Sequence, residues 1–161
     1  MYTVYLGLGS NLGERQRNLD RAIEGLGEVV QITAVSPIYE TAAWGVEEQP
    51  DFLNMCVSAR TELAPYPLLH FVKELEVRLG RKPSQRWGPR EIDIDILIYE
   101  ELIVRSCDLD VPHKGIAERG SVLVPLADIA PDLRHPLSGK TAAELLRQVD
   151  TADVRPYAAG G

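Results

Sequence analysis

The sequence predicts an α+β domain of the ferredoxin-like type: an antiparallel sheet with two helices on one face, plus C-terminal additions. Segments with the two-residue period of strands and segments with a helical apolar stripe follow one another in the order β-α-β-β-α-β. Three of the strands have one apolar side, and their opposite sides carry glycine, aromatic, amide or aspartate residues. We therefore expect the helices to cover the apolar face of the sheet and a ligand to bind the other, open face.

The first half of this order lies within residues 2–35. Tyr2–Leu8 is predicted to be a strand because alternate residues are apolar. A helix over about Glu14–Leu26 follows, since a single apolar stripe repeats at helical spacing. Its members are Leu19, Ala22, Ile23 and Leu26. Ser10 or Asn11 is expected to cap this helix, and Val29–Val35 is predicted to be the second strand.

The second half follows Ser36–Pro50, which we expect to be a long loop, a kind of segment that is commonly functional. The third strand is predicted at Asp51–Arg60 and the second helix at about Tyr66–Leu79. Glu76 lies near the edge of the apolar stripe of that helix, where a solvated acid is expected. The last strand, Ile92–Tyr99, has isoleucine at alternate positions, which are predicted to face the core. These positions are Ile92, Ile94, Ile96 and Ile98.

The elements beyond residue 99 are expected to be short. A short helix is predicted at about Ile116–Arg119, and the apolar segment Val122–Ile129 is expected to be broken at Pro125. Thr141 and Glu144 have the spacing of a capping box, which predicts an amphipathic helix after them. The last ten residues are expected to be frayed.

Composition and charge argue against several classes of protein. The 161 residues carry a net charge of -7, whereas a protein that reads nucleic-acid backbones needs a basic excess. No apolar run approaches the roughly 20 residues of a membrane-spanning helix, and the N-terminus does not resemble a signal peptide. Cys56 and Cys107 lie far apart in the sequence and are expected to be reduced thiols. We expect a single domain over residues 1–161 that is cytoplasmic and monomeric, with no nucleic-acid or membrane partner.

A basic stretch directly precedes a pair of aspartates. Residues 81–90 hold four cations and no acid, namely Arg81, Lys82, Arg86 and Arg90. Asp93 and Asp95 then share one side of the predicted strand, about 6.6 Å apart at about 3.3 Å per residue. Two such carboxylates repel each other unless a cation lies between them, and Mg²⁺ prefers one or two carboxylates together with substrate phosphates. Because guanidinium groups bind phosphate well, these residues predict a magnesium–nucleotide site.

Two glycine-containing segments do not match nucleotide-binding motifs. GLGSNLG has the spacing G-x-G-x-x-x-G rather than G-x-G-x-x-G, and Gly139-Lys140-Thr141 lacks the glycine that a P-loop has five residues earlier. The predicted open face instead places an aromatic ring, Phe52, and an amide, Asn54, beside the aspartate pair. These residue types suit a flat, hydrogen-bonding heterocycle next to a nucleotide.

Several segments together identify a family. GLGSNLG near the start, TAAWG…EQPDFLN, RWGPREIDIDIL, and the later VPH and ERG resemble 6-hydroxymethyl-7,8-dihydropterin pyrophosphokinases, enzymes of folate biosynthesis. The resemblance covers about residues 4–133, and the W-G-P-R-x-x-D-x-D block is its most specific part. It implies transfer of pyrophosphate from MgATP to the hydroxymethyl group of the reduced pterin, release of AMP, and two magnesium ions.

The resemblance also implies roles for individual residues. Asp93 and Asp95 match the metal-binding carboxylates, and both are implied to act in catalysis together with Arg81 and Arg90. The residues implied to bind the pterin are Gly9, Thr41, Trp44, Phe52 and Asn54. The residues implied to bind ATP are Glu76, Trp87, Arg90, Ile96, His113 and Arg119.

A few positions depart from the family pattern. Ser121 stands where a second aromatic ring usually contacts the pterin, and Asp108, Asp110 and Lys114 stand where other residue types are common. Two alternatives therefore accompany the enzyme hypothesis. One is a diverged, non-catalytic module of the same fold that binds pterin or nucleotide, and the other is a ferredoxin-like interaction domain whose aspartates form a solvated strand face. Release of AMP would distinguish the enzyme from both.

Overall fold

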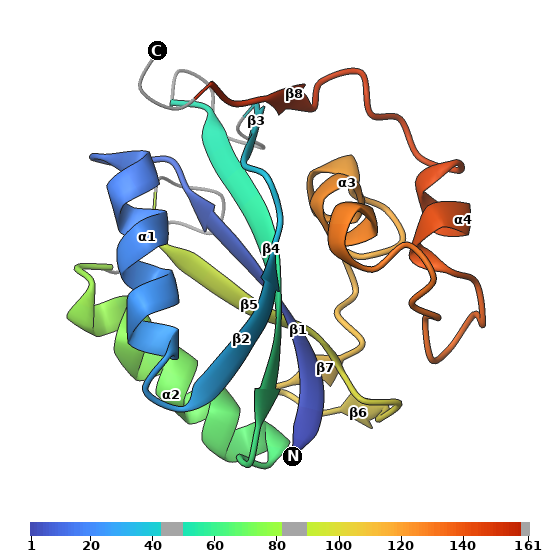
Figure 1. The fold of residues 1–161 in the computed structure, drawn as a ribbon, viewed down its shortest axis with the longest axis horizontal. Helices are drawn as coiled ribbons and strands as arrows, with labels where there is room; N and C mark the ends of the chain where they lie inside the picture. The colour runs from blue at the N-terminus through green and yellow to red at the C-terminus, as the bar shows by residue number, and fades with distance from the viewer. Residues whose placement is uncertain (43–49, 82–89, 159–161) are drawn as a thin grey trace.

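The computed structural model describes residues 1–42, 50–81 and 90–158 (Figure 1). Its central elements are β1 (Tyr2–Ser10), α1 (Arg15–Leu26), β2 (Val30–Val35), β4 (Phe52–Thr61), α2 (Pro65–Arg78) and β5 (Asp93–Tyr99). β1 pairs antiparallel with both β4 and β5, and β2 pairs antiparallel with β4. The resulting order β5-β1-β4-β2, with α1 and α2 on one face of the sheet (Figure 1), confirms the ferredoxin-like prediction.

One large hydrophobic core fills the space between this helical layer and the sheet. The predicted stripe of α1 is buried there at Leu19, Ala22 and Leu26, with Ile23 partly buried beside them. The two helices approach each other closely at Gly25, where an added Cβ would come within 2.5 Å of Leu75 Cδ1. Glycine at this position is therefore needed for the helix pair to pack.

The opposite face of the sheet, which was predicted to be open for a ligand, is open at one end and covered elsewhere by the C-terminal helices. α3 (Gly120–Ile129) lies against it, and α4 (Ala142–Leu146) packs on α3 (Figure 1), so that both helices contribute to a second hydrophobic core. Its buried members are Cys56, Leu97, Ile98, Ile116, Leu123, Leu126, Ala142 and Leu145. α3 runs continuously through Pro125, so the predicted interruption of this segment is wrong. The part of the face that α3 and α4 leave uncovered holds the pocket described below.

A bulge in β5 changes which side its residues face. Leu6 of β1 pairs with Ile96 and Tyr5 pairs with Ile98, so Leu97 is an extra residue in the ladder. Up to Ile96 the predicted alternation holds, with isoleucines in the helix-side core. Leu97 and Ile98 both lie in the second core. The prediction that Ile98 faces the same side as Ile94 is therefore wrong, because a bulge breaks the two-residue period.

Residues 36–50 are not wholly a loop. Tyr39–Thr41 forms β3, which pairs antiparallel with the first residues of β4. Near the other end of the chain, Arg155–Pro156 forms β8 and pairs with β3, so these residues are not frayed as expected. A small second sheet joins β6 (Val104–Arg105) to β7 (Asp110–Val111). Residues 116–119 form a turn that leads into α3, and not the predicted helix.

Capping was predicted correctly for one helix and wrongly for another. At α4, Thr141 Oγ1 accepts a hydrogen bond from Glu144 N at 3.1 Å, and Glu144 Oε1 accepts one from Thr141 N at 3.0 Å. At α1 the cap residue is Glu14, with no side-chain cap bond. Ser10 instead ends β1, and Asn11 is fully buried beyond it.

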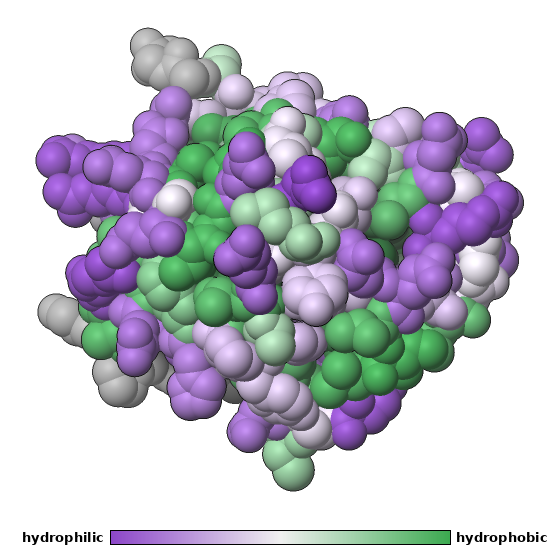
Figure 2. Space-filling view, turned by 60° about the horizontal axis from the view of Figure 1, so that its bottom comes forward, coloured by the Kyte–Doolittle hydropathy of each residue, from purple (hydrophilic) through white to green (hydrophobic). Residues whose placement is uncertain are grey.

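The molecular surface is mixed in character. Figure 2 shows hydrophobic residues gathered in patches between hydrophilic side chains, and exposed large hydrophobic residues include Tyr2, Leu102 and Ile103. Within the described part of the chain, none of the helices has the length and apolarity to cross a membrane.

Candidate active site

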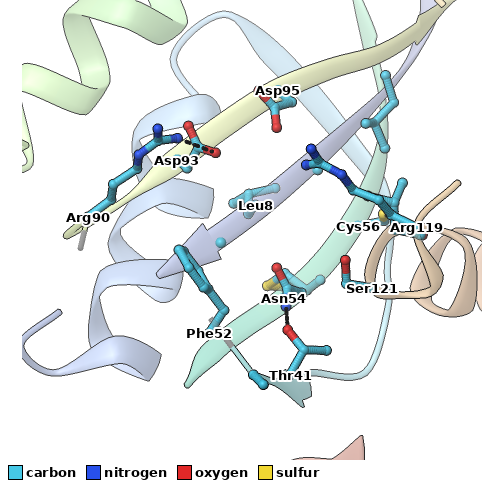
Figure 3. A pocket seen from close by; sticks show the side chains of 16 residues that line it. Leu8, Thr41, Phe52, Asn54, Cys56, Arg90, Asp93, Asp95, Arg119 and Ser121 are labelled. Carbon is cyan, nitrogen blue, oxygen red and sulfur yellow. Dashed lines mark hydrogen bonds and ion pairs between the residues drawn. The ribbon is translucent and has the colours of Figure 1, made fainter. Parts of the chain in front are cut away.

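A pocket lies at the uncovered end of the sheet, between the strands and the start of α3 (Figure 3). β1 contributes Gly7, Leu8 and Gly9 to its floor. Residues of the other strands, of α3 and of the segments next to them surround this floor. They are Thr41, Ala42, Phe52, Asn54, Met55, Cys56, Arg90, Asp93, Asp95, Leu97, Arg119, Ser121 and Val122. The pocket thus brings together the predicted metal ligands and most of the predicted pterin ligands.

Asp93 and Asp95 both line this pocket, as the alternation in the first half of β5 predicts. Asp93 Oδ1 lies 3.1 Å from Arg81 Nη1. Asp93 Oδ2 lies 3.4 Å from Arg90 Nη1, a pair that is drawn in Figure 3. We call Arg81, Arg90, Asp93 and Asp95 the charged wall. Arg81 does not line the cavity itself, but it contacts Asp93, which does.

The electrostatics at Asp95 favour a bound cation. Burial at the pocket floor raises the pKa of Asp95 to about 7, and the negative charge of Asp93 adds to the rise. Among the described residues, no cluster of three or more His, Cys, Asp or Glu side chains could hold a metal ion. Two carboxylates without further protein ligands fit Mg²⁺, which commonly completes its shell with water and substrate phosphates.

His113 approaches Asp95 from the segment after β7. Its Nε2 lies 3.8 Å from Asp95 Oδ1, and its Nδ1 accepts a hydrogen bond from Gly115 N at 3.0 Å. Burial lowers the pKa of His113, and the positive charge of Arg119 lowers it further. A neutral ring whose Nδ1 accepts a hydrogen bond carries its proton on Nε2, so His113 presents a donor toward Asp95.

Glu76 is buried, which corrects the expectation of a solvated acid. Its Oε2 accepts a hydrogen bond from Ile94 N at 2.7 Å and lies 2.9 Å from Arg81 Nη1. Burial raises the pKa of Glu76, while the hydrogen bond from Ile94 acts in the opposite direction. Because Arg81 contacts both Glu76 and Asp93, α2 holds this arginine against β5.

The opposite side of the pocket is neutral. Asn54 Nδ2 donates a hydrogen bond to Thr41 Oγ1 at 2.8 Å, and Phe52 stands beside them (Figure 3). We call Thr41, Phe52 and Asn54 the amide wall. An added Cβ at Gly9 would lie 3.2 Å from Asn54 Oδ1, so the glycine leaves this oxygen accessible as a hydrogen-bond acceptor.

The other predicted site residues have different positions. Arg119 lines the pocket from the residue before α3. Ile96 is 4% exposed and belongs to the helix-side core, so its side chain does not line the pocket. Trp44 and Trp87 lie outside the described residues, as do Lys82 and Arg86.

Asn11 supports the pocket, whereas the sequence predicts that Ser10 or Asn11 caps the first helix. Its Oδ1 accepts a hydrogen bond from Arg90 N at 2.8 Å, and its Nδ2 donates one to Pro50 O at 3.2 Å. Asn11 thus links the end of β1 to Arg90 of the charged wall and to Pro50, which lies two residues before the first strand residue of the opposite side of the pocket. Its pattern, a polar residue just before a helix, is shared with ordinary helix caps, so spacing alone did not distinguish the two roles.

Comparison with known proteins agrees with this geometry. Residues 5–131 match the family model described as 7,8-dihydro-6-hydroxymethylpterin-pyrophosphokinase (HPPK). A curated protein of Aquifex aeolicus named 2-amino-4-hydroxy-6-hydroxymethyldihydropteridine pyrophosphokinase is 46% identical over 144 residues, which cover 89% of this chain and 90% of that one. A protein of the same name from Methylorubrum extorquens is 44% identical over 156 residues, or 96% and 98% of the two chains.

The chain belongs to the HPPK family. A solved structure of wild-type HPPK-DHPS from Plasmodium falciparum has the same fold, with a TM-score of 0.75 at 16% identity. That alignment covers 91% of this chain and 44% of the larger one.

The departures from the HPPK pattern differ in position. Ser121 lines the pocket, at the start of α3 near the amide wall (Figure 3), so its lack of a ring alters the binding surface directly. Asp110 lies outside the pocket lining, and its carboxylate is 3.5 Å from Arg105 Nη1 and 3.3 Å from Lys114 Nζ. Asp110 and Lys114 therefore compensate each other's charge.

Proposed function

We propose that this chain transfers the pyrophosphoryl group of ATP to the hydroxymethyl group of 6-hydroxymethyl-7,8-dihydropterin and releases AMP, as a step of folate biosynthesis. The observation that carries the proposal is the convergence of Asp93 and Asp95 with a neutral, hydrogen-bonding wall in one pocket of a chain of the HPPK family. The names of the relatives at 46% and 44% identity describe the same chemistry.

The two walls divide the pocket between the two substrates. The pterin stacks on Phe52, and its ring nitrogens and amino group hydrogen-bond to the amide wall, because Asn54 Oδ1 is accessible beside Gly9. ATP lies toward β5 and α3, where Arg90 and Arg119 line the pocket and His113 adjoins Asp95. Trp44 and Trp87 are proposed as further ligands of pterin and ATP, respectively.

The charged wall supplies the electrostatic part of the reaction. Asp93 and Asp95 would hold two magnesium ions, which supply positive charge to the triphosphate when bound. Arg81 and Arg90 orient phosphate oxygens by charge-assisted hydrogen bonds. Phosphoryl transfer depends mainly on such positioning and on stabilising charge on non-bridging oxygens.

The bond changes follow from this placement. The hydroxymethyl oxygen of the pterin forms a bond to the β-phosphorus, and the bond from that phosphorus to the oxygen bridging to the α-phosphate breaks. AMP departs with the bridging oxygen, and the hydroxyl proton passes to solvent. Asp93 is placed to accept a hydrogen bond from that hydroxyl before transfer, which orients the nucleophile.

The test is release of AMP. The full chain is incubated with ATP, Mg²⁺ and the reduced hydroxymethylpterin, and the expected products are AMP and the pterin pyrophosphate in equal amounts. Binding of both substrates without AMP would instead support a non-catalytic module, an alternative that the serine at position 121 favours. Failure to bind nucleotide at all would exclude both.

The wider properties of the chain belong to the same proposal. We propose that residues 1–161 act as a single-domain monomer in the cytoplasm, on small-molecule substrates and without a nucleic-acid or membrane partner. The net charge of -7 and the two free cysteines, one buried and one exposed, support this assignment.

A further inference from the structure

We infer that residues 150–157, here called the strap, position the amide wall and so set the affinity for the pterin. This inference rests on the proposed function. The strap leaves α4, passes beside the start of α3 and reaches β3 as β8 (Figure 1). It therefore contacts two different segments that contribute residues to the pocket, although no strap residue lines the pocket itself.

The first contact is with the start of α3. A Cβ added to Gly120 would lie 3.0 Å from Asp150 O and 3.3 Å from methyl carbons of Thr151 and Val154. Gly120 stands between Arg119 and Ser121, which both line the pocket. The absence of a side chain at this residue lets the strap pack directly on the backbone that presents them.

The second contact is with β3 and the start of β4. β8 pairs antiparallel with β3, with Arg155 opposite Glu40, and Tyr157 N donates a hydrogen bond to Ile38 O at 3.0 Å. Glu40 directly precedes Thr41 of the amide wall, and its strand partner Leu53 lies between Phe52 and Asn54. The strap is thus the outermost strand behind this wall.

Arg155 contacts one residue in or next to each of the two strands, β3 and β4, that carry the amide wall. Its Nη2 lies 2.9 Å from Asp51 Oδ2 and 3.6 Å from Glu40 Oε1. Asp51 precedes Phe52, just as Glu40 precedes Thr41. The guanidinium group of Arg155 therefore bridges Glu40 and Asp51, the residues that directly precede Thr41 and Phe52 of the amide wall.

Arg15 of α1 makes a parallel bridge from the other side. Its Nη1 lies 2.6 Å from Glu40 Oε2 and donates to Asp51 O at 2.8 Å. Its guanidinium carbon also lies 5.7 Å from the centre of the Tyr157 ring, which is partly buried against the core. The strap and α1 together hold Glu40 and Asp51 at a fixed separation.

Among the described residues, Asp93 and Arg81 of the charged wall are held by partners that lie outside the strap. Asp93 is held by Arg81 and Arg90, and Arg81 by Glu76 of α2, on the other side of β1 from β3 in the strand order. Arg155 contacts Glu40 and Asp51 beside the amide wall, away from Arg119 and the charged wall, so breaking its bridge should weaken pterin binding selectively. Arg155 is a positioning residue in this scheme, because it acts through Glu40 and Asp51.

The test uses the full-length Arg155→Glu variant, which sets a carboxylate against Glu40 and Asp51. Binding of 6-hydroxymethylpterin is measured by fluorescence in the presence of a non-hydrolysable ATP analogue, and the analogue is titrated separately. We expect the Kd for the pterin to rise about tenfold and the Kd for the analogue to change less than about twofold. Arg147→Glu, at the exposed end of α4, makes the same change of charge and should leave both values unaltered.

The double variant Arg155→Glu/Asp51→Arg restores an opposite-charge pair and should recover most of the pterin affinity. An unchanged pterin Kd in Arg155→Glu, or equal weakening of both ligands with no recovery in the double variant, overturns the inference. These readouts need no turnover. If the wild-type protein binds pterin but releases no AMP, the proposed activity is overturned. The binding data still decide the role of the strap in that case.

Discussion

The two walls of the pocket are held in different ways. In the charged wall, Asp93 contacts Arg81 and Arg90, and these are the groups that phosphate and metal would also engage. In the amide wall, Asn54 and Thr41 satisfy each other with a neutral hydrogen bond, and the ion pairs that support them lie behind the wall. Ligand binding at the charged wall would therefore require an exchange of partners, whereas the amide wall, proposed to bind the pterin, already has its internal hydrogen bond.

The largest expected effect is at the charged wall. Asp95→Ala should lower the rate of AMP release by about a thousandfold, because it removes one of the two carboxylates proposed to hold the charge-neutralising ions. The rate is measured with saturating substrates, and circular dichroism checks the fold. Asp20→Ala, on the exposed side of α1, is the matched control. Turnover within about tenfold of wild type would remove Asp95 from the metal site.

A second substitution tests how the charged wall is supported. Glu76→Ala should lower the free energy of unfolding by about 3 kcal/mol, because it leaves Ile94 N without its 2.7 Å acceptor and a partly buried Arg81 without one of its two acids. Urea denaturation measures the change. Glu74→Ala, exposed on the same helix, should fall within about 0.5 kcal/mol of wild type. Equal losses would mean that burial of Glu76 does not stabilise the wall.

The amide wall should respond more weakly and more selectively. Phe52→Ala removes the ring beside Asn54 and should cost about 1 kcal/mol of pterin binding, or about fivefold in Kd, with little change in ATP binding. Phe71 on α2, which packs against the helix-side core, provides an aromatic control away from the pocket. If Phe52→Ala weakens ATP and pterin equally, the two walls do not divide the substrates.

The smallest expected effect concerns Cys56, which lines the pocket two residues after Asn54. Burial raises the pKa of its thiol far above the ordinary value, so it remains protonated and unreactive at neutral pH. A thiol reagent should therefore modify only the exposed Cys107 in the native protein, both with and without pterin. Rapid labelling of Cys56 in the absence of pterin, but not in its presence, would show that the wall forms only on binding.

Regular periodicity predicted the helices and strands of the central fold, and alternation in β5 placed Asp93 and Asp95 on one side. The bulge at Leu97 was not predictable, because its register depends on pairing with β1 rather than on local sequence. Short strands such as β3 and β8 have too few residues to show a period, and they form through pairing with distant segments. The burial of Glu76 was missed for the same reason, since its partners Ile94 and Arg81 lie on other segments.

The bulge has a consequence for how the domain tolerates change. Asp93 and Asp95, before the bulge, line the pocket, while Leu97 and Ile98 belong to the second core together with residues of α3. β5 thus contributes both to the pocket and to the packing of the C-terminal helices. Deleting Leu97 would remove the extra residue between the pairs Leu6–Ile96 and Tyr5–Ile98, so the rest of the ladder would keep its register. One buried side chain of the second core would be lost, and we expect weaker packing of α3 on the sheet beside the pocket.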